Sequence, residues 1–536
     1  MPNVQDLLEK VIDRKLCTLC GTCIGVCPTV TYIYEEDKII TQRARCNSCG
    51  LCVRSCPGAE YSYPFFNQRI FSCSTNSRIG SFLDILKGWA NKVPLRDSGT
   101  SGGAVTAVIC SLLKKGEIDG ALVASKAEDG GYIALVAKTE DEIRQATQSK
   151  YQFIPINSLI RSVLQMEGKY AIVGLPCHVQ GLRKASIEVP ALEDKFAYIF
   201  GVFCGFNMHK EATEYLLKKS KIPAREIKSM EYRGKHNNAS GFKVTSKSGK
   251  IFFLPKHNYT FLNFFFCNTR CMKCFDFTAE FADISFGDAW ETENCTRIII
   301  RTKRGEKAIN IATNELLYIE DSSETDIFKT QNQLINHKKK YISHRAQLFK
   351  TFPDYKIDFE ILSGKNKVKS WLFFITYSIC SCRFGRLIIR IIPLKLLGFL
   401  SSSIRGIMSG ENSFLFKYIL FGVCTVLFGI ASFFVLNIYL DFRIASIISI
   451  VMTKLFAYYM NKKFVFKSNA KGLRNSVFEF CRFLVARGFT AAIEFFGLIL
   501  LVQVFFVGEN LSRVLLILLT TTVNYILGRR KVFVTS

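Results

Sequence analysis

Apolar and polar residues follow three different patterns along the chain. Between residues 96 and 350, segment 104–116 has apolar residues at helical spacing, whereas 121–124, 169–174 and 198–203 are typical of buried strands. Beyond about residue 410 the apolar stretches become much longer, and the first 60 residues show neither pattern. With 536 residues the chain is also too long for one ordinary core, so we expect a multidomain protein of two to four domains.

Four long apolar stretches near the end of the chain predict an all-α transmembrane domain with four helices. They cover residues 414–440, 444–460, 483–507 and 514–527, and each approaches or exceeds the roughly 17 to 25 residues that a spanning helix needs. The cations that follow the second and fourth stretches belong on the cytoplasmic side by the positive-inside rule. We therefore expect a multi-pass protein of the cytoplasmic membrane, with the rest of the chain in the cytoplasm.

The net charge of +27 lies mainly in this hydrophobic part. Residues 361–536 carry 22 Lys and Arg against five Asp and Glu, a net charge of +17. This distribution indicates contact with a lipid bilayer and predicts no nucleic-acid partner. Residues 320–370, polar and basic, are typical of a solvated linker, and residues 387–400 are predicted to form an interfacial amphipathic helix.

Two cysteine motifs with identical spacing carry the most specific signal. Both read CxxCxxCxxxCP and comprise Cys17, Cys20, Cys23, Cys27, Cys46, Cys49, Cys52 and Cys56. This spacing lets three thiolates bind one [4Fe-4S] cluster while the fourth binds a second cluster. We therefore expect one cluster on Cys17, Cys20, Cys23 and Cys56, and another on Cys46, Cys49, Cys52 and Cys27. Zinc, the alternative, rarely uses a third cysteine at the same interval.

A third group of cysteines predicts a further metal site. Cys267, Cys271 and Cys274 supply three ligands, so a fourth must come from elsewhere in the fold. Cys204 and Cys177 both follow predicted strands; Cys204 is slightly favoured. Cys177 also fits a reactive thiolate at a helix N-terminus or a buried structural cysteine.

A glycine-rich loop precedes the predicted helix at 104–116. Ser101, Gly102 and Gly103 expose backbone N–H groups there, which suits a cofactor phosphate and equally suits a plain turn. Asp283 and Asp288 have two equally weighted interpretations, as solvated turn residues or as members of a site.

An ordered set of motifs resembles the family of coenzyme F420 hydrogenase and dehydrogenase beta subunits across roughly residues 1–350. The motifs are SGGAVTAV, DGALV, QSKY, VGLPC, FCG, YRGK, CxxxCxxC, ADISFGDAW and IIIRTKRG. The resemblance implies an α/β domain in which FAD lies beside a [4Fe-4S] cluster, often with an N-terminal ferredoxin module. It implies a cluster on Cys267, Cys271 and Cys274, and flavin contacts from Ser101, Gly102, Gly103, Lys150, Gly174 and Cys177.

A repeated motif near the C-terminus resembles the GtrA family of small four-helix membrane proteins, over about residues 412–536. YYMNKKFVF, which begins at Tyr458, is echoed by NYILGRRKVF, which begins at Asn524, although Gly528 stands where the first copy has Asn461. The resemblance implies a role with polyprenyl-phosphate-linked sugars during cell-surface glycan synthesis.

These observations predict four regions. They are an α+β ferredoxin-like 2[4Fe-4S] module at 1–62, an α/β flavin and iron–sulfur domain at 63–350, a basic linker with an interfacial helix at 351–411, and the membrane domain at 412–536. The expected function is a membrane-anchored iron–sulfur flavoprotein oxidoreductase with a ferredoxin-like or deazaflavin partner, serving polysaccharide synthesis. The alternative is a translocator of a polyprenyl-linked sugar with an accessory redox domain.

Overall fold

The computed structural model describes most of the chain up to residue 391. Residues 1, 74–76, 128–130, 238 and 360–361 are outside the described part, as are 392–420 and scattered positions beyond 421. The chain divides into two compact units, Met1–Ser401 and Ser402–Ser536.

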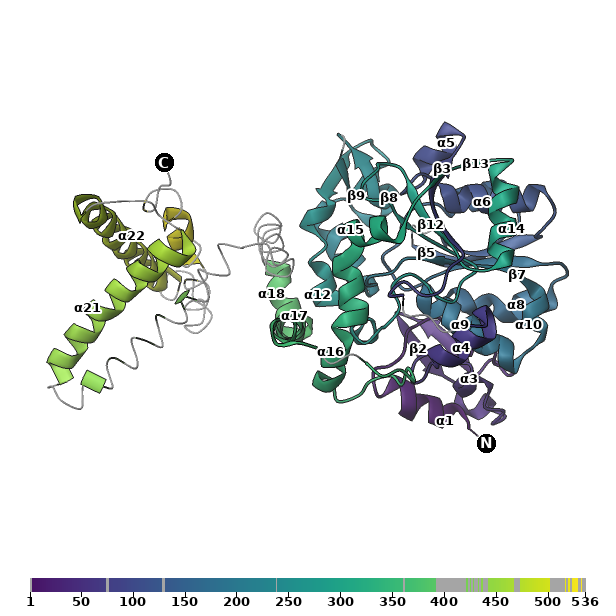
Figure 1. Ribbon diagram of the computed structural model, residues 1–536, viewed down its shortest axis with the longest axis horizontal. Helices are drawn as coiled ribbons and strands as arrows, with labels where there is room; N and C mark the ends of the chain where they lie inside the picture. Colours follow the sequence, from purple (N-terminus) through teal and green to yellow (C-terminus); the bar gives the residue numbers. More distant parts are fainter. Residues whose placement is uncertain are drawn as a thin grey trace. The chain divides into compact units, whose positions relative to one another are not determined.

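An eight-stranded sheet organises the first unit (Figure 1). Its strand order is β13-β3-β12-β11-β7-β6-β4-β5, in which neighbours among β11, β7, β6 and β4 are parallel and the others antiparallel. The strands are β3 (Asp84–Ala90), β4 (Gly120–Lys126), β5 (Tyr132–Ala137), β6 (Tyr170–Gly174), β7 (Phe196–Val202), β11 (Ile284–Asp288), β12 (Thr296–Ile300) and β13 (Leu317–Asp321). The helix predicted at 104–116 and the three predicted strands are confirmed by α6, β4, β6 and β7.

Helices cover both faces of this sheet, which is why its central strands are almost continuously apolar. Helices α6 (Ala104–Lys114) and α14 (Lys303–Thr313) pack on one face, and α8 (Ile160–Gln165), α9 (Pro176–Glu188) and α10 (Ala191–Lys195) pack on the other (Figure 1). Two separate apolar cores result, and the middle region is an α/β fold. The remaining short helices near its edge are α5 (Val93–Ser98) and α7 (Glu140–Gln145).

The N-terminal module is small and repeats itself. Helices α2 (Thr22–Gly25) and α3 (Leu51–Arg54) each follow a glycine with positive φ, Gly21 at 82° and Gly50 at 75°. Between them lies the hairpin of β1 (Tyr32–Glu35) and β2 (Lys38–Thr41), and α1 (Val4–Leu7) and α4 (Tyr63–Phe71) flank the repeat. Each copy therefore places its cysteines in the same local conformation.

A second, antiparallel sheet stands beside the large one. It contains β8 (Ile227–His236), β9 (Ala239–Ser246) and β10 (Ile251–Pro255), and it shares an apolar core with α11 (Lys210–Ser220) and α12 (Leu262–Phe266). The short helix α13 (Thr269–Met272) then carries part of the third cysteine group.

The prediction of a solvated linker over 320–370 is wrong for most of this segment. Helices α15 (Glu324–Ile335) and α16 (Ile342–Leu348) bury Ile327, Ile335 and Ile342. The chain then returns to the N-terminal module, where Asp354 N donates to Ala59 O at 2.8 Å and Tyr61 N donates to Asp354 O at 2.8 Å. Helices α17 (Gly364–Ser381) and α18 (Arg383–Ile391) follow, and only residues 387–391 of the predicted interfacial helix fall in the described part.

The second unit is described in pieces. Its two long helices are α21 (Phe442–Met460) and α22 (Leu473–Ile499). Within the described residues, no helix combines the length and the apolar composition that a membrane crossing requires. The predicted stretch at 414–440 lies mainly outside the described residues, and the stretch at 514–527 is described only in part.

Candidate functional site

Four cysteines from both N-terminal motifs surround one cavity, and we name them the outer set: Cys27, Cys46, Cys49 and Cys52. They line a space of about 250 Å³. Several donors point at the sulfurs: Tyr32 OH donates to Cys52 Sγ at 3.0 Å and Thr31 N donates to Cys27 Sγ at 3.4 Å. The last cysteine of the first motif therefore joins the first three of the second motif.

The other four N-terminal cysteines, Cys17, Cys20, Cys23 and Cys56, form the middle set. Burial raises the pKa of the Cys17 thiol to about 12, and the nearby Cys56 adds to that rise. Burial likewise raises the pKa of Cys56 to about 11, with Cys20 as the next cause. The pKa of Cys23 is raised by burial, by the three other members and by Cys52 of the outer set. The two sets are therefore neighbours.

Four further cysteines, Cys204, Cys267, Cys271 and Cys274, form the inner set. Cys204 follows β7, and the other three come from the segment around α13. Burial raises the pKa of Cys204, with Cys271 and Cys274 among the lesser causes. A hydrogen bond from Cys267 is the main reason why the pKa of Cys271 falls to about 6. The structure thus brings the predicted fourth cysteine to the other three.

Cys177 lies between the middle and inner sets, at the start of α9. Burial raises its pKa, and the next causes are Cys20 of the middle set and then Cys204, Cys271 and Cys274 of the inner set. Five thiols therefore gather where four are needed, and both candidates for the fourth ligand are in place.

Buried cations surround the inner set. Lys338 and Arg345 are each 1% exposed and Arg270 is 2% exposed. Lys338 Nζ donates to Cys271 O at 3.1 Å, and Arg345 Nε donates to Met272 O at 2.9 Å. None of the three forms an ion pair with a carboxylate in the part of the chain that the structure describes. Because an unpaired buried charge costs several kcal/mol, these side chains indicate a negatively charged group beside them.

A cubane iron–sulfur cluster held by four thiolates meets that requirement, because its overall charge is negative. Every cysteine in the described residues is a free thiol. Across the same residues, no three His, Cys, Asp or Glu side chains come close enough to share one metal ion. Each set supplies four thiols, the number that a [4Fe-4S] cluster takes at one thiolate per iron.

The carboxyl ends of the parallel strands meet beside the inner set. Gly174 ends β6, Cys204 follows β7 and Asp288 ends β11. The glycine loop after β3 reaches the same edge, because Ala90 N donates to Gly102 O at 2.8 Å. Crevices at this edge of a parallel sheet are the usual ligand sites of α/β folds.

Asp288 is the polar centre of this edge. Ser101 Oγ donates to its carboxylate, Arg233 Nη1 donates to it at 2.6 Å and Trp290 Nε1 donates to it at 3.0 Å. Burial alone would raise the pKa of Asp288, but Arg233, with Lys256 and Ser101, lowers the pKa to about 2. Asp288 is therefore an ionised, paired residue of the folded protein and no solvated turn residue.

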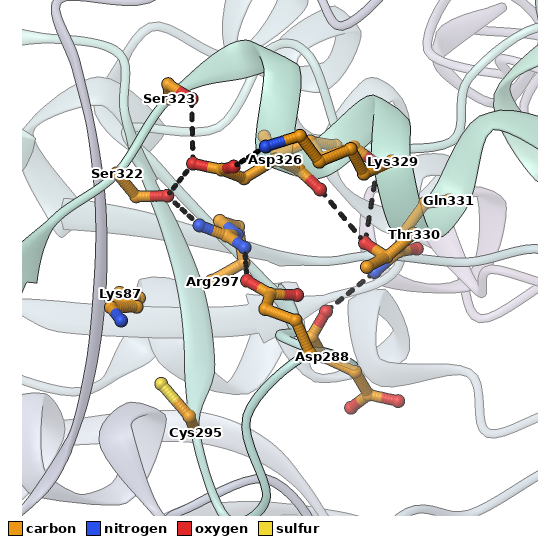
Figure 2. A network of polar contacts seen from close by, with 12 residues as sticks. Lys87, Asp288, Cys295, Arg297, Ser322, Ser323, Asp326, Lys329, Thr330 and Gln331 are labelled. Carbon is orange, nitrogen blue, oxygen red and sulfur yellow. Dashed lines mark hydrogen bonds and ion pairs between the residues drawn. The ribbon is translucent and has the colours of Figure 1, made fainter.

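A network behind the turn after β11 holds Asp288 in place (Figure 2). Gln331 Nε2 donates to Asp288 O at 2.7 Å. The buried Arg297 pairs with Glu291 in the same turn and donates to Ser322 Oγ. Arg233 lies in the YRGK motif, but its contact with Asp288 forms only after folding. Sequence reasoning missed Arg297 and Gln331, because no motif marks them.

The predicted flavin contacts fall into two places. Ser101, Gly102 and Gly103 lie next to the Lys150 segment, because Ser149 N donates to Thr100 Oγ1 at 3.0 Å. Lys150 Nζ donates to Ala146 O and Thr147 O, each at 2.8 Å, and burial lowers its pKa to about 7. Since both Ser101 and Lys150 are satisfied within the protein, the structure does not single them out as phosphate ligands.

The second unit contains a small pocket between its helices. The pocket encloses about 220 Å³, and its polar lining consists of Asn461, Arg487 and Asn524. Asn461 is 6% exposed and its Oδ1 has no hydrogen-bond partner. Nearby, Tyr458 OH donates to Glu479 at 2.7 Å and Lys462 pairs with the same carboxylate at 3.2 Å.

Comparison with known families assigns most of the chain. Residues 9–65 match a 4Fe-4S dicluster domain. Residues 85–161 and 167–325 match the N-terminal and C-terminal parts of the coenzyme F420 hydrogenase/dehydrogenase beta subunit, and residues 417–533 match the GtrA/DPMS transmembrane domain. The chain therefore combines the two domains of the coenzyme F420 hydrogenase/dehydrogenase beta subunit family with a 4Fe-4S dicluster domain and a GtrA/DPMS domain. Both resemblances are thereby confirmed.

Relatives of the region that matches this family are archaeal. The chain is 27% identical over 324 residues to the coenzyme F420-dependent sulfite reductase of Methanocaldococcus jannaschii, covering 56% of the chain and 47% of that protein. It is 24% identical over 326 residues to one of the F420H2 dehydrogenase subunits of Methanosarcina mazei, covering 59% and 87%. The chain thus spans about half the length of the sulfite reductase.

The GtrA/DPMS region has a bacterial relative. It is 30% identical over 121 residues to the cell wall teichoic acid glycosylation protein GtcA of Listeria monocytogenes, covering 22% of the chain and 83% of that protein. The match supports a membrane protein.

Proposed function

We propose that the chain is a membrane-anchored iron–sulfur oxidoreductase that moves electrons between a redox partner protein and a two-electron coenzyme. The observation that supports this proposal most strongly is a row of neighbouring sites. The row consists of the outer set, the middle set, the inner set and then the carboxyl edge of the sheet with Asp288. Cys23 links the outer and middle sets, and Cys177 links the middle and inner sets. Such a row suits electron transfer and serves no evident purpose in a hydrolase or a simple anchor.

Each cysteine set would hold one [4Fe-4S] cluster. The outer cluster would be held by Cys27, Cys46, Cys49 and Cys52; the middle one by Cys17, Cys20, Cys23 and Cys56; and the inner one by Cys267, Cys271, Cys274 and either Cys204 or Cys177. Clusters of this type supply one-electron chemistry over a wide range of potentials. The protein excludes water by burying the thiols, and Tyr32 OH and Thr31 N hydrogen bond to sulfurs that would carry negative charge.

The coenzyme would reach the carboxyl edge, and its proposed contacts are Ser101, Gly102, Gly103, Lys150, Gly174 and Cys177. FAD and the deazaflavin F420 are the two candidates, and the matched family descriptions and relatives carry the name of F420. Either coenzyme supplies hydride chemistry when bound. Arg233 keeps the Asp288 carboxylate ionised and oriented, so that this edge presents a fixed negative charge.

The expected partners follow from this arrangement. A ferredoxin-like protein would exchange electrons with the outer set, on the cytoplasmic side of the cytoplasmic membrane. The GtrA/DPMS domain would hold the chain at the bilayer with four spanning helices. A role in polysaccharide synthesis would follow from that domain, since the related GtcA is named for teichoic acid glycosylation.

A second candidate function is translocation of a polyprenyl-phosphate-linked sugar by the GtrA/DPMS domain. The pocket of the second unit favours it, because Arg487 suits an anionic group and the unpaired Asn461 Oδ1 suits a hydroxyl donor. In that case the redox region would accompany or regulate transport.

Anaerobic mixing with reduced F420 tests the proposed function. The full chain, purified without oxygen, should lose its visible iron–sulfur absorption when reduced F420 is added, as electrons enter the clusters. Cys271→Ser should block this bleaching, and Cys110→Ser, a buried cysteine of α6 outside the three sets, should not. Bleaching by ferredoxin or dithionite but not by reduced F420, with FAD released on denaturation, would identify FAD as the coenzyme. A purified chain without iron–sulfur absorption would contradict the oxidoreductase function.

A further inference from the structure

Arg270 lies inside the third cysteine segment and reaches the N-terminal module. Its guanidinium donates to Gly58 O at 3.2 Å through Nε, to Pro57 O at 3.3 Å through Nη2 and to Tyr355 OH at 2.8 Å through Nη1. All three acceptors are neutral. Because Arg270 is almost fully buried, its charge must be balanced by groups around it.

The thiols of two different sets face that charge. In the middle set, the guanidinium hydrogen bonds to the carbonyls of Pro57 and Gly58, the two residues that directly follow Cys56. In the inner set, Arg270 directly precedes Cys271 in the chain. The described residues place no carboxylate in an ion pair with Arg270.

Contacts next to Arg270 tie the same two sets together. Asn268 Nδ2 donates to Cys17 O at 3.2 Å, and the bonds from Arg270 hold Pro57 and Gly58, which directly follow Cys56. The segment that carries the inner set is therefore hydrogen-bonded to the segments that carry the middle set. The charge of Arg270 therefore lies next to a ligand of the inner set in the chain and next to a ligand of the middle set through hydrogen bonds.

We propose that Arg270 is the shared counterion of the middle and inner clusters, and that it sets the reduction potentials of both. The inference rests on the proposed function. A reduced cluster carries one more negative charge than an oxidised one, so a buried cation beside it favours reduction. Little water screens a charge in this position, so the effect reaches both clusters. Arg270 acts through the clusters and is a positioning and tuning residue.

Two lysines provide matched controls, because each faces one set only. Lys338 acts on Cys204, Cys267 and Cys271 of the inner set. Lys184 Nζ donates to Cys56 O at 2.8 Å and acts on Cys56 of the middle set. Substitution of each residue by Gln removes the charge and keeps a polar side chain.

The test is a redox titration of the full chain, followed by the electron paramagnetic resonance signals of its clusters. Arg270→Gln should lower the midpoint potentials of two clusters and leave the third unchanged. We expect about a tenfold fall in the ratio of reduced to oxidised cluster at the wild-type midpoint, which corresponds to about 59 mV for one electron. Lys338→Gln and Lys184→Gln should each lower one potential.

Arg270→Lys keeps the proposal testable if Arg270→Gln loses iron. Lysine retains the charge, so both potentials in Arg270→Lys should stay close to those of the wild type. If Arg270→Gln cannot be measured, Lys338→Gln serves as the reference for a lowered potential at the inner cluster. Wild-type iron content with one potential or none shifted in Arg270→Gln would overturn the proposal, as would a full shift of both in Arg270→Lys. A wild-type chain without an inner cluster would instead overturn the proposed function itself.

Discussion

The burial of several charged residues in this protein is explained by the cysteines near them. Lys338 and Arg345 belong to a basic run that on its own favours a solvated surface, yet each is 1% exposed. Their ammonium and guanidinium groups point at backbone carbonyls of the inner cysteine segment. Charge that would be costly in an apolar core becomes favourable next to a negative cluster.

The crossed arrangement of the N-terminal cysteines leads to a prediction about single substitutions. Cys27→Ser and Cys46→Ser should abolish the same resonance signal, whereas Cys17→Ser and Cys56→Ser should abolish the other one, because members of each pair lie in one set. Each variant should lose up to about four irons per chain. Cys110→Ser is the control and should keep all signals. If Cys27→Ser removed the same signal as Cys17→Ser, the two motifs would bind their clusters without crossing.

Asp288 leads to a pH-dependent prediction. Its pKa falls from 3.8 to about 2 in the folded protein, so its ionised form stabilises the fold above about pH 4, and this contribution is lost as the pH falls through about 2. Asp288→Asn should lower the free energy of unfolding by about 2 kcal/mol at neutral pH.

The measurement compares thermal unfolding of the wild type and Asp288→Asn from neutral to acidic pH. The difference should stay constant down to about pH 5 and shrink below about pH 4, where the carboxylate of the unfolded chain becomes protonated, until it is lost near pH 2. Asp97→Asn, which removes an exposed ion pair with Lys235 at 3.8 Å, is the control and should have almost no effect. A difference that grows on acidification would contradict the assignment.

The strands of the large sheet place the residues of the candidate site at one edge of the sheet. β6, β7 and β11 run parallel, so the residues that follow each strand lie at the same edge of the sheet although they are far apart in the sequence. The glycine loop completes this edge. A Cβ on Gly102 would lie 2.1 Å from Asn294 O, so the loop and the turn after β11 approach more closely than any side chain allows.

Gly102→Ala should therefore destabilise the protein more than Gly116→Ala. Both glycines have positive φ, 81° and 69°, and share that backbone strain, but nothing lies within 4 Å of a Cβ at Gly116. The excess loss for Gly102 should be about 1 to 3 kcal/mol. Chemical denaturation of the two variants measures it, and equal losses would show that the close approach is unimportant.

Much of this architecture could be predicted from local sequence, and the exceptions have a physical cause. Two signals are local in the sequence: the cysteine spacing, and the apolar runs at 121–124, 169–174 and 198–203. Both the crossed sets and the strands could therefore be predicted. Asp288 remained ambiguous because its partner Arg233 is 55 residues away and reaches it only in the folded chain. The basic run around Lys338 was misinterpreted for the same reason, since the thiols that it faces lie on other elements.

At the scale of the whole molecule, the three cysteine sets form an ordered row through the first unit. The outer set belongs to the N-terminal module, the inner set lies at the carboxyl edge, and the middle set connects them. The GtrA/DPMS domain adds a second function at the level of the chain, attachment to a membrane.

Membrane attachment predicts the behaviour of the full chain during extraction. The protein should remain in the membrane pellet after treatment with alkaline carbonate, because spanning helices are held by hydrocarbon and not by charge. A peripheral protein bound through its basic residues, the control, should be released. Recovery of the full chain in the supernatant would contradict the proposed anchor.

The number of clusters tests the central claim most directly. Iron and acid-labile sulfide should be measured on the full chain purified without oxygen, together with integration of its resonance signals after reduction. Three clusters require about twelve irons per chain and three interacting signals. About eight irons, with Cys271→Ser indistinguishable from the wild type, would show that the inner set holds no cluster and that the proposed electron path does not reach the sheet.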